Sequence, residues 1–187
     1  ARELSGKLGV DPGWDPLKFI SDECNERGME LQAWINIIKV WSGVNIPPET
    51  VNKHLLRSHP KWCSLYKREW WIDLGYPDAR KYTIDIVKDI LSKYDIDGLH
   101  FDYLRYPGKD FDDDESYRQF GAKANKNDWR RNNINLFLSE INKFVKETKP
   151  YVKIGAAPIG IYKNIPGING WSSYDNLFQD SKYWVDN

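Results

Sequence analysis

The sequence predicts an α/β fold of the (β/α)8 barrel type, present as an incomplete barrel. Strand-like segments alternate with amphipathic helical segments, an order typical of parallel strands with helices packed outside the sheet. The segments after the strands are long and those after the helices are short, as in barrels whose strand-to-helix loops build the site. No glycine-rich phosphate loop follows a strand, which argues against the other common arrangement, a nucleotide-binding doubly wound sheet.

The chain is too short for a whole barrel of this type. A whole (β/α)8 barrel typically needs about 250 residues, whereas this chain has 187. We therefore expect one domain, residues 1–187, that forms an internal piece of a longer barrel. The open strand edges of such a piece would favour a homo-oligomer.

The first helix–strand unit is predicted between residues 15 and 36. Asp15 followed by Pro16 is typical of a helix start, and Gly28 of a helix end. The apolar stripe of this helix consists of Leu17, Ile20 and Cys24. We interpret Cys24 as a buried free thiol, and residues 31–36 as a buried strand.

The second unit begins at Asp78, which we expect to cap a helix running to about Tyr94. The apolar stripe of this helix consists of Ile84, Val87 and Leu91. Residues 96–103 then have the composition and spacing of a strand, which ends before a Tyr-Pro-Gly segment.

The third unit begins near Asp128 and its helix ends at Pro150. Its apolar residues, which repeat at helical spacing, are Ile134, Phe137, Leu138, Ile141 and Val145. A short strand is expected over residues 152–157 and a last helix over residues 175–185.

The composition narrows the class of partner. Basic and acidic side chains balance at 27 each, so the chain lacks the excess of Lys and Arg that nucleic-acid binding requires. No apolar run approaches the roughly 20 residues of a membrane span. Nine Trp and eleven Tyr residues provide flat faces that suit sugar rings, although such side chains also build cores.

The strand expected at residues 96–103 carries the main candidate for catalysis. Side chains alternate along a strand, so Gly98, His100 and Asp102 share one face, and Leu99 and Phe101 share the other. The apolar pair should meet the outer helices, which points the polar set into the barrel. Asp102 then lies at the carboxyl end of the strand, where barrel enzymes place their catalytic groups.

Two neighbours of this strand are candidates for substrate binding. Arg105 could pair with a carboxylate or bind sugar hydroxyls; the alternative is an aspartate that caps a turn beside an ordinary salt-bridged arginine. Trp34 and Asn36 share one face of the preceding strand. Asn36 could orient a substrate hydroxyl, or it could simply start a turn.

The segment from Lys39 to Pro77 is much longer than a connection requires, which is typical of a functional loop. It is too aromatic for disorder, with Trp41, Trp62, Tyr66, Trp70 and Trp71. Some of these rings should line the site and others should pack on the loop itself. Asp73, in the same loop, is a weak candidate for a second carboxylate.

Other signals indicate no metal site and no cofactor. His54 and His59 lack a third ligand at zinc spacing. The acidic run at residues 112–115 lacks the glycine and the terminal glutamate of an EF-hand, and we interpret it as a solvated loop.

Several stretches resemble a known family, the glycosyl-hydrolase-like barrels called family-10-like or DUF187. The matching stretches are DPGWDPL (11–17), RGMELQAWIN (27–36), YDIDGLHFDYLRYP (94–107), WRRNNI (129–134) and KIGAAPIG (153–160). The resemblance implies a (β/α)8 barrel that acts on glycosidic bonds, in extracytoplasmic bacterial proteins that are periplasmic, lipid-anchored or secreted. It also implies a catalytic carboxylate at Asp102. Two positions depart from the family pattern: Gln32 replaces the usual His, and Tyr103 replaces a second Asp.

These observations lead to one expected function and one alternative. We expect a glycosidase acting on a bacterial or dietary polysaccharide or a peptidoglycan-type glycan, with Asp102 as nucleophile or oxocarbenium stabiliser. Substrate-binding roles are assigned to Trp34, Asn36, Asp73, His100, Arg105 and Tyr106. The general acid is expected after Asn187. The alternative is a carbohydrate-binding or structural barrel fragment without turnover; a deacetylase would need a set of metal ligands that the sequence does not offer.

Overall fold

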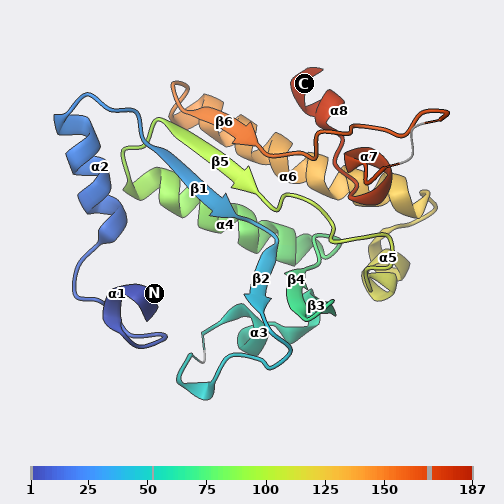
Figure 1. Ribbon diagram of the computed structural model, residues 1–187, viewed down its shortest axis with the longest axis horizontal. Coiled ribbons are helices and arrows are strands. Elements are labelled where there is room, and N and C mark those ends of the chain that lie inside the picture. Colours follow the sequence, from blue (N-terminus) through green and yellow to red (C-terminus); the bar gives the residue numbers. More distant parts are fainter. Residues whose placement is uncertain (1, 52, 168–169, 187) are drawn as a thin grey trace.

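A parallel sheet forms the centre of the molecule. The structure, a computed structural model, describes residues 2–51, 53–167 and 170–186. In this part of the chain β1 (Gln32–Asn36), β5 (Gly98–Asp102) and β6 (Lys153–Ala156) pair in the order β1-β5-β6 (Figure 1). This mixed α/β architecture agrees with the predicted class and is consistent with part of a (β/α)8 barrel. The incompleteness of the barrel stays a prediction.

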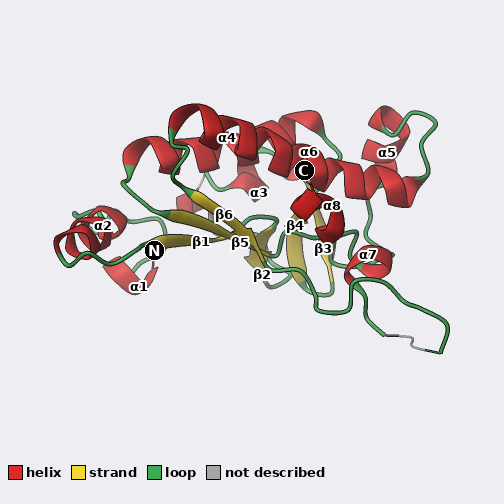
Figure 2. Cartoon of the chain, turned by 90° about the horizontal axis from the view of Figure 1, so that it is seen from above, coloured by secondary structure: helices red, strands yellow, loops and turns green. Residues whose placement is uncertain are grey.

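Two long helices cover one face of this sheet. Helices α4 (Pro77–Lys93) and α6 (Lys126–Thr148) lie on the same side of the strands (Figure 2). Leu99 and Phe101 point to this side and are fully buried, and the rings of Phe101 and Phe137 meet edge to face at 5.4 Å. The predicted burial of these two strand residues against the helices is confirmed, as is that of the helix stripes Ile84, Val87 and Leu91 and Ile134, Phe137, Ile141 and Val145.

Helix starts follow the expected chemistry with small shifts. Helix α2 (Pro16–Glu26) begins after Asp15, whose carboxylate accepts hydrogen bonds from two backbone N–H groups of the first turn, as predicted. The prediction that Asp78 caps helix α4 is wrong: Tyr76 occupies the N-cap position without a side-chain hydrogen bond, and Pro77 begins the helix. Asp78 lies within the first turn, where its charge interacts favourably with the helix dipole. Helix α6 starts two residues before Asp128, because the side chain of Asn125 caps it.

The prediction that residues 31–36 are buried is wrong for most of the strand. Ala33 is buried, whereas Gln32, Trp34 and Asn36 on the other face of β1 are exposed. The physical reason is that β1 pairs only with β5 among the described strands, and no described element covers its outer face. Helix α2 is likewise poorly covered: the side chain of Ile20 is exposed and Cys24 is only half-buried.

The last helix is divided, which the sequence did not predict. Helix α7 (Ser173–Asn176) and helix α8 (Ser181–Asp186) are separated by a turn at Phe178, whose φ is +59°. The Phe178 ring is fully buried against Tyr106, with ring centroids 5.6 Å apart. The side-chain amide of Gln179 donates to the carbonyl of Leu104. Packing of these two side chains into the interior breaks the helical path.

The long segment after β1 forms a small antiparallel sheet. Its strands are β2 (Lys39–Ser42), β3 (Cys63–Tyr66) and β4 (Glu69–Ile72), in the order β2-β4-β3. Figure 1 shows this sheet extending from the carboxyl ends of the central strands. The remaining helices are α1 (Arg2–Ser5), α3 (Leu55–Ser58), α5 (Asp114–Phe120) and the 3-10 turns Glu49–Val51 and Pro60–Trp62.

Candidate active site

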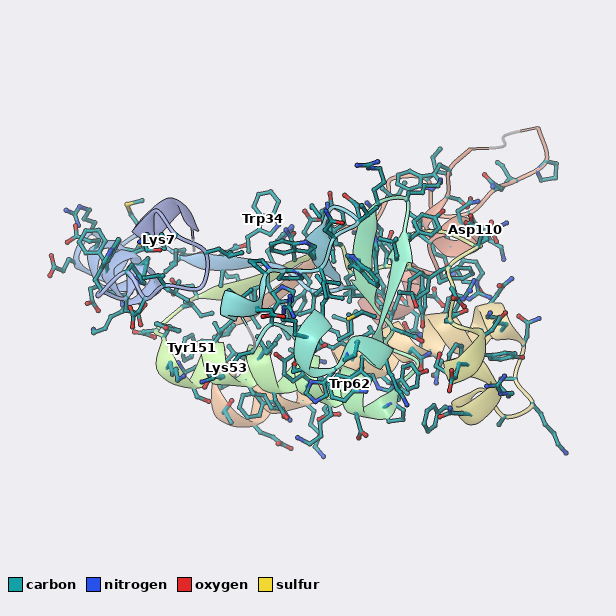
Figure 3. All side chains as sticks on the ribbon, turned by 90° about the horizontal axis from the view of Figure 1, so that it is seen from below. Lys7, Trp34, Lys53, Trp62, Asp110 and Tyr151 are labelled. Carbon is teal, nitrogen blue, oxygen red and sulfur yellow. The ribbon has the colours of Figure 1, made fainter. Side chains whose placement is uncertain are left out.

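Asp102 lies at the carboxyl end of the central strand, on the face that the helices do not cover. The register pairs Asn36 with Asp102 and Trp34 with His100. The rings of Trp34 and His100 meet edge to face at 5.6 Å. Trp34 is 72% exposed and points away from helix α4 (Figure 3). The strand pairing therefore brings Trp34, Asn36, His100 and Asp102 onto one open surface.

One oxygen of Asp102 is engaged by the backbone. Oδ1 accepts a hydrogen bond of 2.7 Å from the amide of Tyr103, a residue whose φ is +53°. The left-handed conformation of Tyr103 turns the chain sharply at the end of the strand. Arg105, two residues later, then lines a cleft. Asp102 is half-buried, and its Oδ2 has no hydrogen-bond donor among the described residues.

Arg105 is held by aromatic rings. The carbon of its guanidinium lies 5.0 Å from the ring centre of Tyr103 and 5.0 Å from that of Trp171. Burial lowers the pKa of this guanidinium, against the influence of the neighbouring charges of Asp102 and Glu69. Within the described ranges no carboxylate oxygen lies within 4.0 Å of it, so the alternative of an ordinary salt-bridged arginine does not describe this residue.

A cleft of about 520 Å³ opens beside Arg105. It lies between the β3–β4 hairpin, the segment after β5 and the segment before helix α7. Its aromatic walls are Tyr66, Trp71, Tyr103 and Trp171. Two aromatic residues of the long loop, Tyr66 and Trp71, thus line this cleft. Others pack on the loop itself: Trp62 stacks on His59 at 3.9 Å.

The cleft also contains a carboxylate that the sequence interpretation missed. Glu69 lies in its lining and forms an ion pair of 2.5 Å with Lys39, whose ammonium sits 5.2 Å from the ring centre of Tyr103. Glu69 begins β4 after a tight turn at Lys67 and Arg68, both with positive φ. Such turns are usually signalled by Asn-Gly or Asp-Gly. Without that signal, only the alternation of residues 63–72 could have indicated the hairpin.

Asp73 and Tyr106 lie apart from the open face, in the interior. Asp73 is 2% exposed; its Oδ1 accepts from the amide of Gly75, and its Oδ2 accepts from the hydroxyl of Ser116. Burial raises the pKa of this carboxyl to about 7. The hydroxyl of Tyr106 is buried and accepts from the amide of Asn133. This placement corrects the expectation of direct sugar contacts at both positions, because the surrounding protein encloses the two side chains.

The acidic run at residues 112–115 is only partly solvated, which corrects a second expectation. Asp113 is buried and accepts two hydrogen bonds of 2.6 Å from the guanidinium of Arg130. The buried charge of Asp113 is therefore compensated inside the protein. The described residues include no group of three or more His, Cys, Asp or Glu side chains placed to hold a metal ion.

The structure is thus an α/β protein with an acidic residue at the carboxyl end of a parallel strand and an aromatic cleft that Arg105 lines. The model of the family glycosyl hydrolase-like 10 matches residues 2–187, and the chain belongs to this family. The resemblance read from the sequence is thereby confirmed. None of the helices in the described ranges is both long and apolar enough to span a membrane.

Individual relatives agree with this assignment. The chain is 35% identical over 195 residues to glycosyl hydrolase YngK of Bacillus subtilis (strain 168), covering 97% of this chain and 38% of that protein. It is 34% identical over 203 residues to glycosyl hydrolase DigH of Escherichia coli (strain K12), covering 98% of this chain and 46% of that protein. The chain thus spans less than half the length of these curated relatives.

A solved structure agrees in fold. The crystal structure of a hypothetical protein from Ruminiclostridium thermocellum ATCC 27405 superposes with a TM-score of 0.50 at 18% identity. The match covers 83% of this chain and 70% of that one. At this identity the likeness concerns the fold alone.

Proposed function

We propose that this chain supplies a substrate-binding face and one catalytic carboxylate, Asp102, to a glycoside hydrolase that acts on a polysaccharide or a peptidoglycan-type glycan. The observation that carries the proposal is the position of Asp102 at the carboxyl end of the central parallel strand, on the face away from the helices. Active sites of parallel α/β barrels are built at this end of the strands. Membership of a glycosyl hydrolase-like family supports the same reaction class.

Each polar group of the open face has a role in this reaction. The amide of Tyr103 holds Oδ1 of Asp102, which leaves Oδ2 to attack or stabilise an oxocarbenium-like anomeric carbon. The exposed ring of Trp34 provides a flat apolar surface for a pyranose. Asn36 and His100, its neighbours on this face, are then placed to bind sugar hydroxyls and fix the ring over Asp102.

Hydrolysis needs a second carboxyl group, about 5–5.5 Å away for retention or about 6.5–9.5 Å for inversion. Asp73 does not suit this role because it is buried in the interior. Glu69 lines the cleft, but its carboxylate is already engaged in an ion pair with Lys39. We therefore place the general acid in the part of the protein outside residues 1–187, since the curated relatives extend well beyond the matched region.

The test is the change Asp102→Asn in the protein that carries this chain. We expect hydrolysis of a fluorescently end-labelled glycan to fall about a hundredfold or more, while the Kd for the glycan changes little, because the side chain keeps its shape. The matched control is Asp95→Asn, an exposed aspartate at the amino end of the same strand. Unchanged turnover in Asp102→Asn would remove Asp102 from catalysis.

A non-catalytic glycan-binding role is the alternative, and two observations favour it: the exposed ring of Trp34 on the open face, and the aromatic walls of the cleft. Under this alternative the full protein binds glycans through Trp34 and the cleft, and no turnover is measured with any glycan offered. Binding without hydrolysis in the wild-type protein would therefore select it.

A further inference from the structure

The guanidinium of Arg105 has no polar partner among the residues that the structure describes. Its charge sits between the rings of Tyr103 and Trp171, and it donates no hydrogen bond to any acceptor in the described part of the chain. Burial lowers its pKa, which means that its surroundings disfavour the charge. Charged groups that are withdrawn from water are normally paired. The N–H groups of Arg105 are therefore available to a ligand in the cleft that it lines.

A second donor, buried in the wall of this cleft, also lacks a partner among the described residues. Trp71 lines the cleft, and its indole Nε1 is buried without a hydrogen-bond acceptor among the described residues. Both Trp71 and Arg105 contact the ring of Tyr103, at centroid distances of 5.6 Å and 5.0 Å. The two donors are thus neighbours across one aromatic ring, and of the two it is the half-exposed guanidinium of Arg105 that can reach a ligand in the cleft.

The charges around the cleft favour an anion. Its acidic lining residues are already engaged: Glu69 pairs with Lys39, and Asp110 accepts from the hydroxyl of Tyr66. Its basic lining residues Lys67, Arg105 and Lys109 have no carboxylate within 4.0 Å in the described ranges. Among the described lining residues three basic side chains stand against two acidic ones, and one of the acidic ones, Glu69, is already paired with Lys39 outside the lining. The cleft therefore carries an excess of positive charge, although the chain as a whole is neutral.

We propose that Arg105 binds a carboxylate on the sugar that occupies this cleft, so that the substrate is an acidic glycan. A guanidinium presents a planar fork of N–H groups that matches the two oxygens of a carboxylate. The surrounding rings of Tyr66, Tyr103 and Trp171 would contact the faces of the same or the adjoining sugar. Because Arg105 follows Asp102 by three residues, a carboxylate bound here would fix a sugar unit beside the catalytic position. The inference rests on the proposed function and specifies its substrate.

The experiment compares acidic glycans with their carboxyl-reduced counterparts by isothermal titration calorimetry. The probes are oligosaccharides of galacturonic acid, whose carboxylate is on the ring, and peptide-free peptidoglycan strands, whose carboxylate is on an ether side chain. Asp102→Asn protein is used so that no probe is hydrolysed during the measurement. We expect carboxyl reduction to weaken binding of at least one probe about tenfold or more, and the probe affected identifies the source of the carboxylate.

Variants assign this preference to Arg105. Arg105→Gln should lose the preference for the acidic form and bind the reduced form as the parent protein does, and Arg105→Lys should retain part of it because the charge remains without the fork. Arg118→Gln removes the same charge from the exposed face of helix α5 and should leave the preference unchanged. If Arg105→Gln does not fold, the comparison of acidic and reduced glycans in the parent protein still decides whether a carboxylate is recognised, and Arg105→Lys tests the role of the guanidinium.

The outcomes separate this inference from the proposed function. Equal affinity for acidic and reduced glycans, or a preference that survives Arg105→Gln, overturns the inference even where the wild-type protein hydrolyses neutral glycans. A preference that depends on Arg105 supports it even where no hydrolysis is found, since binding is measured independently of turnover.

Discussion

Arg130 holds Asp113 through two parallel hydrogen bonds of 2.6 Å, from Nε to Oδ2 and from Nη2 to Oδ1. Both side chains are buried, and the same guanidinium also donates to the carbonyls of Lys109 and Phe111. The pair thereby fixes the segment that leads from the cleft to helix α5. A local ion pair thus sets the position of Lys109 and Asp110, which line the candidate binding site.

Replacing Arg130 by methionine should destabilise the protein strongly. The change removes two hydrogen bonds from the buried carboxylate of Asp113, which keeps only the ammonium of Lys126 at 2.6 Å. Such a loss costs about 1–3 kcal/mol or more. Urea unfolding measures the free energy. Arg118→Met, on the exposed face of helix α5, is the control and should stay within about 0.5 kcal/mol of wild type. A similar small effect for Arg130→Met would show that the pair contributes little.

Asp73 should make stability depend on pH in an unusual direction. The hydroxyl of Ser116 lies 2.5 Å from Oδ2 of Asp73 and 3.0 Å from the carbonyl oxygen of Asp113, but it has one proton for two acceptors. When Asp73 is protonated it donates to Ser116, and Ser116 donates to Asp113, so both contacts are hydrogen bonds. Burial raises the pKa of Asp73 to about 7, although the hydrogen bond that Ser116 donates to the carboxylate acts in the opposite direction.

Between pH 3.8 and about 7, Asp73 is therefore protonated in the folded state but ionised in the unfolded state. Stability falls as pH rises through this window, by up to about 1.4 kcal/mol per pH unit, and levels off above it. Asp73→Asn mimics the protonated acid and should remove this contribution. Urea unfolding of both proteins across the window measures the difference. Parallel stability curves for wild type and Asp73→Asn would contradict the assignment, and Asp112→Asn, an exposed neighbour, is the control.

The sequence predicts the part of the fold that follows from hydrophobic periodicity. The alternation around His100 identified both faces of β5, and the stripe of Ile134 and Phe137 identified the buried face of α6. These patterns are local, because each helix and strand needs one apolar face whatever its neighbours are. The same alternation along the strand identified the catalytic candidate Asp102.

The remainder depends on tertiary packing that no local pattern records. Lys67, Arg68 and Phe178 adopt positive φ without being Gly, Asn or Asp, so turn chemistry gives no warning of the β3–β4 hairpin or of the break between α7 and α8. Asp73 follows β4 directly, and only the three-dimensional position of Ser116 explains its burial. The cleft and its carboxylate Glu69 escaped prediction because they depend on the hairpin.

Gly75 should not tolerate a side chain. A Cβ atom at this position would lie 2.3 Å from the ring of Trp129 and 2.7 Å from the hydroxyl of Ser116, both in the interior. Gly75→Ala should therefore cost about 1–3 kcal/mol through overpacking, measured by urea unfolding. Gly160→Ala is the matched control, because nothing lies within 4 Å of its added Cβ. Equal stability of the two variants would mean that the interior around Asp73 accommodates a methyl group.

Trp34 and Phe101 lie on opposite faces of the same sheet, and their truncations should separate binding from stability. Trp34 is largely exposed, so Trp34→Ala should change the free energy of unfolding by no more than about 1 kcal/mol. Loss of its ring should weaken glycan binding about tenfold, as is common for tryptophan at a binding surface. Phe101 is fully buried against Phe137, and Phe101→Ala should cost about 3–5 kcal/mol.

Urea unfolding and calorimetric titration of the same glycan, applied to both variants, check this pair of expectations. Trp34 is largely exposed, and β1 and β5 pair through their backbones. We therefore expect the strands to stay paired without its ring, so that any loss of affinity reports on the open surface. If Trp34→Ala lost as much stability as Phe101→Ala but bound glycan normally, Trp34 would contribute to stability and not to binding. The face of the sheet opposite the helices would then be a structural surface, and Asp102 would have no sugar platform beside it.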